Sequence, residues 1–352
     1  MRSKFAAVVC AIAALAVVAA PASAKGPKSD LEFLGQAIVP TGTTFEGTTV
    51  GGLSSITYDA RRGIFYTVSD DPANVRYYTV GLDVGDGRLS NGDVRFEDVT
   101  TLLAPSGAAY APSSVDPEGL ALTKDRELIF TSEGIANSLI DPFVRRYSLD
   151  GTFLGSLPVP QDFLPNAART RGVRQNLGFE SAGVAPNGRF LFVATENALV
   201  QDGPAASVAT GSPARIVRYQ LPSGRLDREW VYETDPVAEP PSPPTQFSVN
   251  GLVELLPLNN RFLLAMERSF SVGAPDTGNT IRIYTLELPG RGGEAGKELV
   301  LDLDELGLPL DNVEGMTFGP RLPDGRRSVV LVSDSNFAAG QFTQFLLFAL
   351  DR

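Results

Sequence analysis

The sequence predicts an all-β fold, namely a single β-propeller of five four-stranded blades. Three observations predict it: an internal repeat that occurs five times, four strand-like stretches in nearly every repeat unit, and one spare strand near the start of the chain. Self-similarity at a fixed period is typical of architectures in which each unit buries its apolar face only against its neighbours.

The first segment of each unit predicts an inner strand that starts at Glu-Gly or a similar pair. The starts of these segments are 66, 62, 70 and 64 residues apart. We expect the glycine where backbones approach closely near a crowded axis. The five segments are residues 52–56, 118–122, 180–184, 250–253 and 314–318.

Three more strands follow in each unit, which is the strand count of a propeller blade. The second segment is apolar and ends on a carboxylate, at residues 64–70, 129–133, 191–196, 262–267 and 329–334. The third is centred on an aromatic residue, at residues 78–80, 147–149, 219–221, 284–286 and 348–350. The fourth occupies residues 95–103, 152–159, 226–233 and 298–303.

The fifth unit lacks a fourth strand, whereas residues 31–39 form a strand that no unit claims. We therefore expect this N-terminal strand to complete the last blade and close the ring, which removes exposed sheet edges. The alternative is six blades, with the extra one hidden in residues 160–177 or 235–249, although neither stretch has room for four strands.

The first 24 residues have the pattern of a secretory signal peptide. Arg2 and Lys4 precede an apolar run, and Ala22-Ser23-Ala24 forms a small-residue cleavage site. The run is too short for a membrane anchor, so we expect an exported protein, periplasmic or extracellular. Residues 25–352 then form one propeller domain.

Charge and composition narrow the classes of partner and of chemistry. Removing the signal leaves 28 basic and 41 acidic residues, a net charge of −13, which makes nucleic acid an improbable partner. The mature chain has no His, and its only cysteine, Cys10, lies in the signal. A Ser-His-Asp triad, a Cys-His pair and a His-ligated zinc or iron site are therefore excluded. We expect a monomer that binds a small anionic ligand.

The acids are predicted to converge on one mouth of the propeller channel. The first two strands of a blade are antiparallel, so the start of one and the end of the other emerge on the same face. Clustered oxygen ligands favour calcium, although each acid alone is equally well explained as an acceptor for loop amides. The predicted metal ligands are Glu118, Glu133, Glu180, Glu196, Glu267, Glu314 and Asp334, followed by Asp70 and Asn250.

Long loops and arginines lie on the same predicted face. The long connections, which often carry function, are residues 40–51, 104–116, 160–177, 197–214, 235–249 and 270–280. Arg169, Arg171 and Arg174 lead into the third inner strand, and Arg268 follows a second strand. Arginine suits phosphate recognition, so these four are the predicted substrate-binding residues. The alternative is a charged, solvated loop with internal Arg–Asp pairs.

Three runs resemble the phytase-like propeller domain known as "esterase-like activity of phytase". They are residues 116–121 (DPEGLA), 174–180 (RQNLGFE) and 312–316 (NVEGM), together with the acid-tipped strand ends. The likeness covers roughly residues 31–352. It implies calcium on the acidic face, a bound phosphoester and attack on phosphorus by a metal-bound water.

Three functions are compatible with the sequence. The first is a secreted, calcium-dependent phosphoesterase acting on a phosphorylated small molecule. The second is a non-catalytic binding propeller with structural calcium, because a fold alone does not determine function. The third, hydrolysis of a carboxylic ester, is the weakest, since the chain has neither a His to activate a serine nor a Gly-x-Ser-x-Gly elbow.

Overall fold

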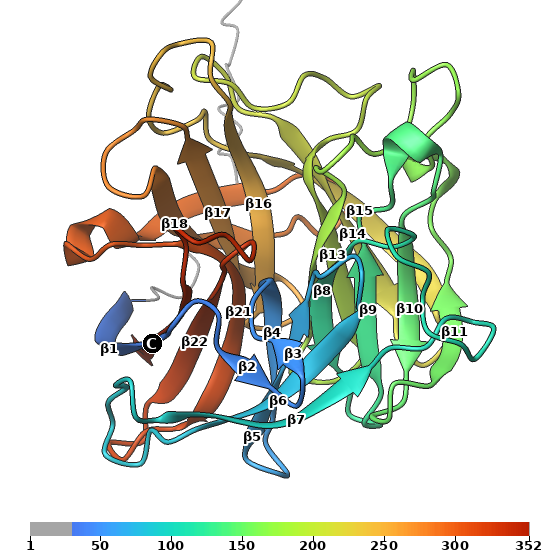
Figure 1. Cartoon of the computed structure of the whole chain (residues 1–352). Helices are drawn as coiled ribbons and strands as arrows, with labels where there is room; N and C mark the ends of the chain where they lie inside the picture. The colour runs from blue at the N-terminus through green and yellow to red at the C-terminus, as the bar shows by residue number, and fades with distance from the viewer. Residues whose placement is uncertain (1–29, 352) are drawn as a thin grey trace, which may run out of the picture.

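The computed structural model describes residues 30–351 and shows five antiparallel sheets arranged as the blades of a ring (Figure 1). The five-bladed prediction is confirmed, and the predicted signal peptide, residues 1–24, lies outside the described residues. Within the described part, no helix is long and apolar enough to span a membrane. The helical elements there are short 3₁₀ turns: η1 (Ala136–Ser138), η2 (Gln161–Phe163) and η3 (Leu303–Leu306).

Each blade runs from an inner strand at the axis to an outer strand at the rim. The inner strands are β4 (Leu53–Asp59), β8 (Pro117–Leu122), β12 (Phe179–Val184), β16 (Ser248–Pro257) and β21 (Asn312–Arg321). The second strands are β5 (Ile64–Ser69), β9 (Leu128–Ser132), β13 (Phe190–Ala198), β17 (Phe262–Ser271) and β22 (Arg327–Asp334).

The two remaining positions also match the predicted pattern. The third strands are β6 (Arg76–Leu82), β10 (Phe143–Tyr147), β14 (Pro213–Gln220), β18 (Asn279–Glu287) and β23 (Thr343–Asp351). The outer strands are β7 (Val94–Thr101), β11 (Phe153–Leu157), β15 (Arg225–Glu233), β20 (Gly296–Asp302) and β1 (Asp30–Val39). Blade 3 has a fifth strand, β19 (Gly293–Glu294), parallel to β15, and a hairpin joins β2 (Thr44–Phe45) to β3 (Thr48–Thr49).

The N-terminal strand closes the ring as predicted. β1 pairs antiparallel with β23 from Asp30 opposite Asp351 to Val39 opposite Thr343. The register shifts between Phe33 and Gly35, where a Cβ would lie 2.3 Å from the carbonyl oxygen of Leu89. The closure therefore joins the N-terminal strand to the C-terminal one, and β1 covers the edge of β23 that would otherwise be unpaired.

Apolar packing between neighbouring blades forms the core. In the described residues each blade interface has its own cluster of buried apolar side chains, such as the one that joins Phe65 of blade 1 to Leu347 of blade 5. β6 and β23 are almost completely buried because both faces of these strands are covered by neighbouring blades. Outer strands such as β7 alternate between exposed and half-buried positions, which is the pattern of a one-sided strand.

The inner strands approach closely around the axis, which explains their glycines. A Cβ on Gly119 would lie 2.6 Å from the carbonyl oxygen of Glu180, and one on Gly315 would lie 2.9 Å from Ser55 Cα. Real Cβ atoms do not reach such distances, so larger residues there would push the blades apart. The close approach predicted for the repeated glycine is confirmed.

A buried carboxyl group fills the middle of the channel. Glu254 of blade 4 accepts a hydrogen bond at 2.7 Å from the hydroxyl of Ser55 in blade 1, although these two blades are not adjacent. It also accepts from the backbone N–H of Leu255 at 2.9 Å, and from the backbone of Met316 and Ala182 in blades 5 and 3. One side chain thus links four blades across the axis.

Candidate metal and anion site

A cavity of about 950 Å³ occupies the mouth where inner strands begin and second strands end. Its floor carries carboxylates from blades 1, 2, 3 and 5, and one cation, Arg268 of β17, from blade 4. The predicted residues that line it are Asp70, Glu118, Glu133, Glu180, Glu196, Glu314, Asp334 and Arg268. The predicted convergence of acids on one mouth is therefore observed for these side chains.

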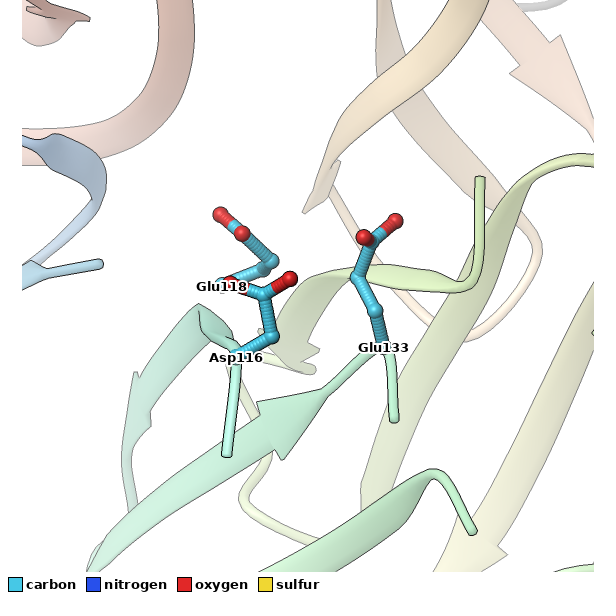
Figure 2. A group of neighbouring side chains, drawn as sticks. All are labelled: Asp116, Glu118 and Glu133. Atoms are coloured by element: carbon cyan, nitrogen blue, oxygen red, sulfur yellow. The ribbon is translucent and has the colours of Figure 1, made fainter. Parts of the chain in front are cut away.

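Two overlapping groups of carboxylates have the spacing of a cation site. Asp116, Glu118 and Glu133 each offer one oxygen, and these oxygens all lie within 4.8 Å of one another (Figure 2). Glu133, Glu180 and Glu196 form a second group of the same kind. Glu133 belongs to both groups, and the backbone N–H of Gly178 donates to its Oε1 at 2.7 Å, which orients the carboxylate.

Burial and mutual repulsion hold these carboxyl groups toward their protonated forms. Burial raises the pKa of Asp70 to about 7, with Glu314 and Asp116 adding to the effect. Burial likewise raises the pKa of Glu133 to about 8 and that of Glu196 to about 7. A cation would reverse this balance by stabilising the ionised forms.

The other acids of the cavity respond in the same direction. Burial raises the pKa of Asp116 to about 6, and Glu314 adds to this. For Glu118, Glu180 and Asp334 burial is again the largest cause, and neighbouring carboxylates push the pKa of each group well above its ordinary value. The cavity therefore concentrates carboxyl groups whose ionisation the protein stabilises only in part.

Arg268 supplies that partial stabilisation. Its Nη2 lies 2.8 Å from Glu314 Oε1 and 3.4 Å from Glu196 Oε1. Burial alone would lower the pKa of this guanidinium, but Glu196 and Glu314 outweigh it and raise the pKa above its ordinary value. Arg268 is therefore a permanent cation at the bottom of an acidic cavity.

Several buried polar atoms at the cavity have no hydrogen-bond partner among residues 30–351. They include Asp70 Oδ1, Glu196 Oε1 and Arg268 Nε. Glu196 is only 2% exposed, and the 3.4 Å approach of Arg268 does not form a well-directed hydrogen bond to its Oε1. Buried polar groups are normally paired, so free lone pairs here fit a hard cation that prefers oxygen ligands.

Glycines make room for these two carboxylates. A Cβ on Gly52, which has φ +62°, would lie 1.9 Å from Asp70 Oδ1. A Cβ on Gly251 would lie 2.2 Å from Glu196 Cγ. Both acids thus occupy space that exists only because glycine stands just before β4 and within β16. The residues present therefore fit a calcium ion, which the family resemblance implies.

Glu267 and Asn250 do not reach the cavity. β17 continues to Ser271 rather than ending at Glu267, and successive strand residues point to opposite faces. Arg268 faces the cavity, so Glu267 faces blade 3. Glu267 accepts a hydrogen bond at 2.7 Å from Tyr232 of that blade and one at 2.8 Å from Asn250 of β16. Their predicted role as metal ligands stays a prediction without support from the geometry.

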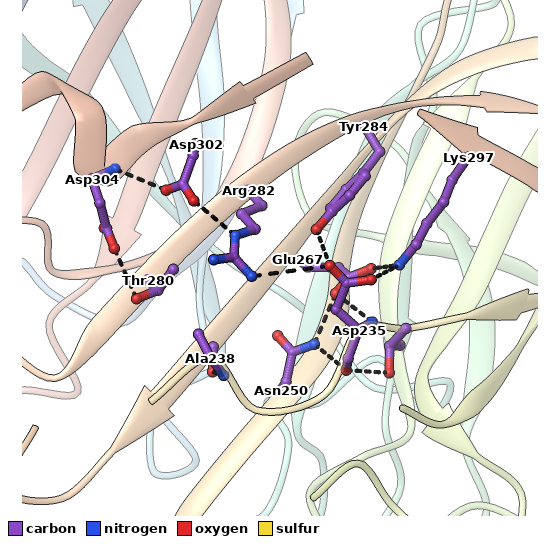
Figure 3. A network of polar contacts seen from close by, with 12 residues as sticks. Asp235, Ala238, Asn250, Glu267, Thr280, Arg282, Tyr284, Lys297, Asp302 and Asp304 are labelled. Carbon is purple, nitrogen blue, oxygen red and sulfur yellow. Dashed lines mark hydrogen bonds and ion pairs between the residues drawn. The ribbon is translucent and has the colours of Figure 1, made fainter. Parts of the chain in front are cut away.

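Glu267 instead belongs to a polar network at the interface of blades 3 and 4 (Figure 3). Lys297 lies 2.6 Å from both Glu267 and Asp235, and Tyr284 donates to Asp235 at 2.5 Å. The backbone N–H of Asp235 donates to Glu267 at 2.9 Å. The network therefore ties the start of the 235–249 loop to the blade.

The three loop arginines also lie away from the cavity lining. Arg174 donates from Nε to the carbonyl oxygen of Ala198 at 3.0 Å and also bonds Gly203, which joins two long loops. Arg171 donates to the carbonyl oxygen of Leu164 at 3.4 Å, and the side chain of Arg169 is exposed. The geometry gives Arg174 a structural contact and leaves substrate binding by all three as a prediction.

The sequence analysis missed several lining residues. Asp116 lies two residues before Glu118, and Asn312 lies two residues before Glu314. Residues at i and i+2 of an extended chain share a face, so this spacing is the signal that could have found both. Gln175 and Asn176 also line the cavity, and they lie in the 174–180 run that resembles the family motif. Asp311 lines it from the residue before Asn312.

The family model described as "Phytase-like: Esterase-like activity of phytase" matches residues 48–337. The chain belongs to this family. No curated protein matches the phytase-like chain.

Solved structures similar to the phytase-like chain include several with low identity. An endo-arabinase from Bacteroides thetaiotaomicron shows 12% identity and a TM-score of 0.47, covering 90% of this chain and 97% of that one. A Dyadobacter fermentans protein of unknown function shows 11% identity and a TM-score of 0.45, covering 92% of this chain and 100% of that one. A putative 6-phosphogluconolactonase from Bacteroides uniformis shows 10% identity and a TM-score of 0.35, covering 87% of this chain and 89% of that one. Similarities at this level carry no argument about activity.

Proposed function

We propose that this phytase-like propeller hydrolyses phosphate esters of small molecules with the aid of a divalent cation, Ca²⁺, held at the acidic cavity. The observation that carries the proposal is that two clusters of three acidic residues overlap at Glu133. They lie in a cavity of about 950 Å³, a size that fits small-molecule ligands.

The donor set is suited to calcium. All candidate ligands are oxygens, and Asp70 Oδ1 and Glu196 Oε1 accept no hydrogen bond within residues 30–351. Asp116, Glu118 and Glu133 would hold one cation, and Glu180 and Glu196 extend the site. When bound, such a cation supplies Lewis acidity toward a phosphoryl oxygen and lowers the pKa of water.

Arg268 is the residue of this chain suited to receive the phosphate. Its guanidinium is held ionised by Glu196 and Glu314, and its buried Nε–H has no acceptor. A phosphoryl oxygen at that position would satisfy the orphan donor, and a charge-assisted hydrogen bond would orient the ester. Because Arg268 is largely buried, this interaction would be stronger than the same contact in water.

A second candidate function is a binding propeller with a structural cation. The specific observation in its favour is that Glu133, Glu180 and Glu196 are all buried. A cation fully enclosed by them would have no open position for a substrate. Asp116 is only partly buried, which is the reason that we place a reactive cation in the first group.

The experiment combines cation binding with hydrolysis. Purified protein is titrated with Ca²⁺ by calorimetry and assayed on 4-nitrophenyl phosphate, bis(4-nitrophenyl) phosphate and 4-nitrophenyl acetate, in Ca²⁺ and in EGTA. The proposal expects calcium binding and calcium-dependent release of nitrophenol from at least one phosphate ester. Glu133→Gln should abolish both, whereas Glu298→Gln on the exposed surface should change neither.

Other outcomes select other functions. Calcium binding without phosphate ester hydrolysis would support the structural cation. Absence of calcium binding would overturn the proposal, and calcium-independent cleavage of the acetate would point to a carboxylic esterase.

A further inference from the structure

The lining of the cavity includes apolar side chains as well as acids. Phe247, at the end of the 235–249 loop, and Phe270 of β17 both line the cavity, and their ring centroids are 6.2 Å apart. Val249, Leu177 and Ala206 add to the apolar part of the lining. The same cavity therefore presents carboxylates, a guanidinium and hydrocarbon surface.

Phe247 is unusual among the exposed apolar side chains. Its residue is 62% exposed, the largest value among the large apolar residues that are exposed within residues 30–351. The others, such as Leu154 and Phe337, do not line the cavity. Single exposed apolar residues are common on protein surfaces, but an exposed ring at the mouth of a polar cavity offers a surface that a ligand can cover.

The aromatic pair is held by regular structure. The carbonyl oxygen of Phe247 accepts from the N–H of Val272 at 3.0 Å, and β16 begins at the next residue. Val249 pairs directly with Phe270 in the β16–β17 ladder. The backbones that carry both rings are therefore held by the hydrogen bonds of blade 4, at the start of β16 and the end of β17.

Phe270 and the cation of the floor lie on one face of one strand. Arg268 and Phe270 are two residues apart on β17, so their side chains point to the same side. Strand geometry separates their Cα atoms by roughly 7 Å. A ligand whose phosphate reaches Arg268 would therefore place its ester group beside Phe270.

We propose that the natural ligands of this cavity are phosphate monoesters of a phenol, with the ring packed on Phe247 and Phe270. The proposal rests on the proposed function and specifies its substrate class. In the hydrolysis, water oxygen bonds to phosphorus, and the P–O bond to the aryl oxygen breaks. The bonding electrons stay on that oxygen, which takes up a proton released by the water. A ligand that carries only hydroxyl and phosphate groups would leave the two rings in water.

The test uses phosphonates, which bind but cannot be hydrolysed at the P–C bond. Phenylphosphonate and methylphosphonate are titrated by calorimetry into the full chain in millimolar Ca²⁺. We expect about tenfold tighter binding of the phenyl compound, because aromatic contacts add to apolar burial. Phe247→Ala and Phe270→Ala should each reduce the preference severalfold without changing methylphosphonate affinity. Leu154→Ala, an exposed apolar residue on β11, is the matched control.

The outcomes separate this inference from the function on which it rests. Equal affinity for the two phosphonates, or an unchanged preference in Phe247→Ala, overturns the inference even if phosphate esters are hydrolysed. A phenyl preference lost in both variants, in a protein that hydrolyses no phosphate ester, supports the ligand class and overturns the enzyme. Binding of neither phosphonate overturns the inference, and hydrolysis in the same preparation then decides separately on the enzyme.

Discussion

The carboxyl group of Glu254 in the propeller channel should make the stability of the fold depend on pH. The side chain is 1% exposed, and burial raises its pKa to about 8 despite hydrogen bonds from Ser55 and from the backbone. In the unfolded chain the pKa returns to its ordinary value of 4.5. Replacement by glutamine keeps the shape and removes the titration.

The sign follows from the protons bound in each state. Below pH 4.5 both states are protonated, and the contribution of Glu254 to stability is fully present. Between pH 4.5 and about 8 the folded protein holds a proton that the unfolded chain has lost, so wild-type stability falls as the pH rises. Above this range both states are ionised, and the loss is complete.

The folded-state pKa exceeds the ordinary value by about 3.5, which corresponds to about 5 kcal/mol at about 1.4 kcal/mol for each pH unit. Between pH 5.5 and 7.5 the unfolding free energy of wild type should therefore fall by roughly 2 to 3 kcal/mol relative to that of Glu254→Gln. Taking the difference between the two proteins cancels the titration of the acidic cavity, which both retain.

The assay is urea denaturation of both proteins at half-unit pH steps from 5 to 8.5, in EGTA so that bound cations do not contribute. Glu298→Gln, an exposed glutamate on β20, controls for the loss of one acid. A difference between wild type and Glu254→Gln that stays constant across this range would refute the reasoning. In that case the donors around Glu254 outweigh its burial, and the carboxylate is ionised in the folded protein.

Three more predictions concern the acidic cavity and the ring closure. Ca²⁺ at a hundredfold excess over its Kd should stabilise wild type by about 2.7 kcal/mol, seen as a higher melting temperature than in EGTA, and Glu133→Gln should lose this shift; equal shifts in both proteins would contradict it. Because the pKa values of Asp70 and Glu196 are raised to about 7 and that of Glu133 to about 8, calcium should release protons at pH 7 and bind more tightly as the pH rises from 6 to 8. Calorimetry in buffers of different ionisation enthalpy measures this release, and a buffer-independent heat would argue against it. Deletion of residues 1–40 should lower the melting temperature and promote association, because it exposes the edge of β23; gel filtration and thermal denaturation that match wild type would show that ring closure is dispensable.

Local sequence pattern determined the blades. Each unit opens with a recurrent motif in its inner strand, and the other strand segments follow in the same order. The five units and their closure by residues 31–39 could therefore be predicted without a structure. The acids at the ends of these strands, such as Glu118 and Asp334, were located because antiparallel geometry alone brings those ends to one mouth.

The details of the site depended on where strands end and which way side chains face. Glu267 and Arg268 are neighbours within β17, so their side chains point to opposite faces of the strand. Arg268 faces the cavity, and Glu267 therefore faces away from it. Asp116 was visible in the spacing to Glu118 but was not used. The loop arginines, exemplified by Arg174, make backbone contacts that no local pattern encodes.

Only the tertiary structure brought together the groups that are far apart in the chain. Ser55 and Glu254 are 199 residues apart and meet across the channel, and nothing in either local sequence specifies the contact. Arg268 gains its two carboxylate partners, Glu196 and Glu314, from the blades on either side. Strand formation follows from nearby residues, whereas the charge and burial of a side chain at the axis are sums over all five blades, which exist only once the ring has closed.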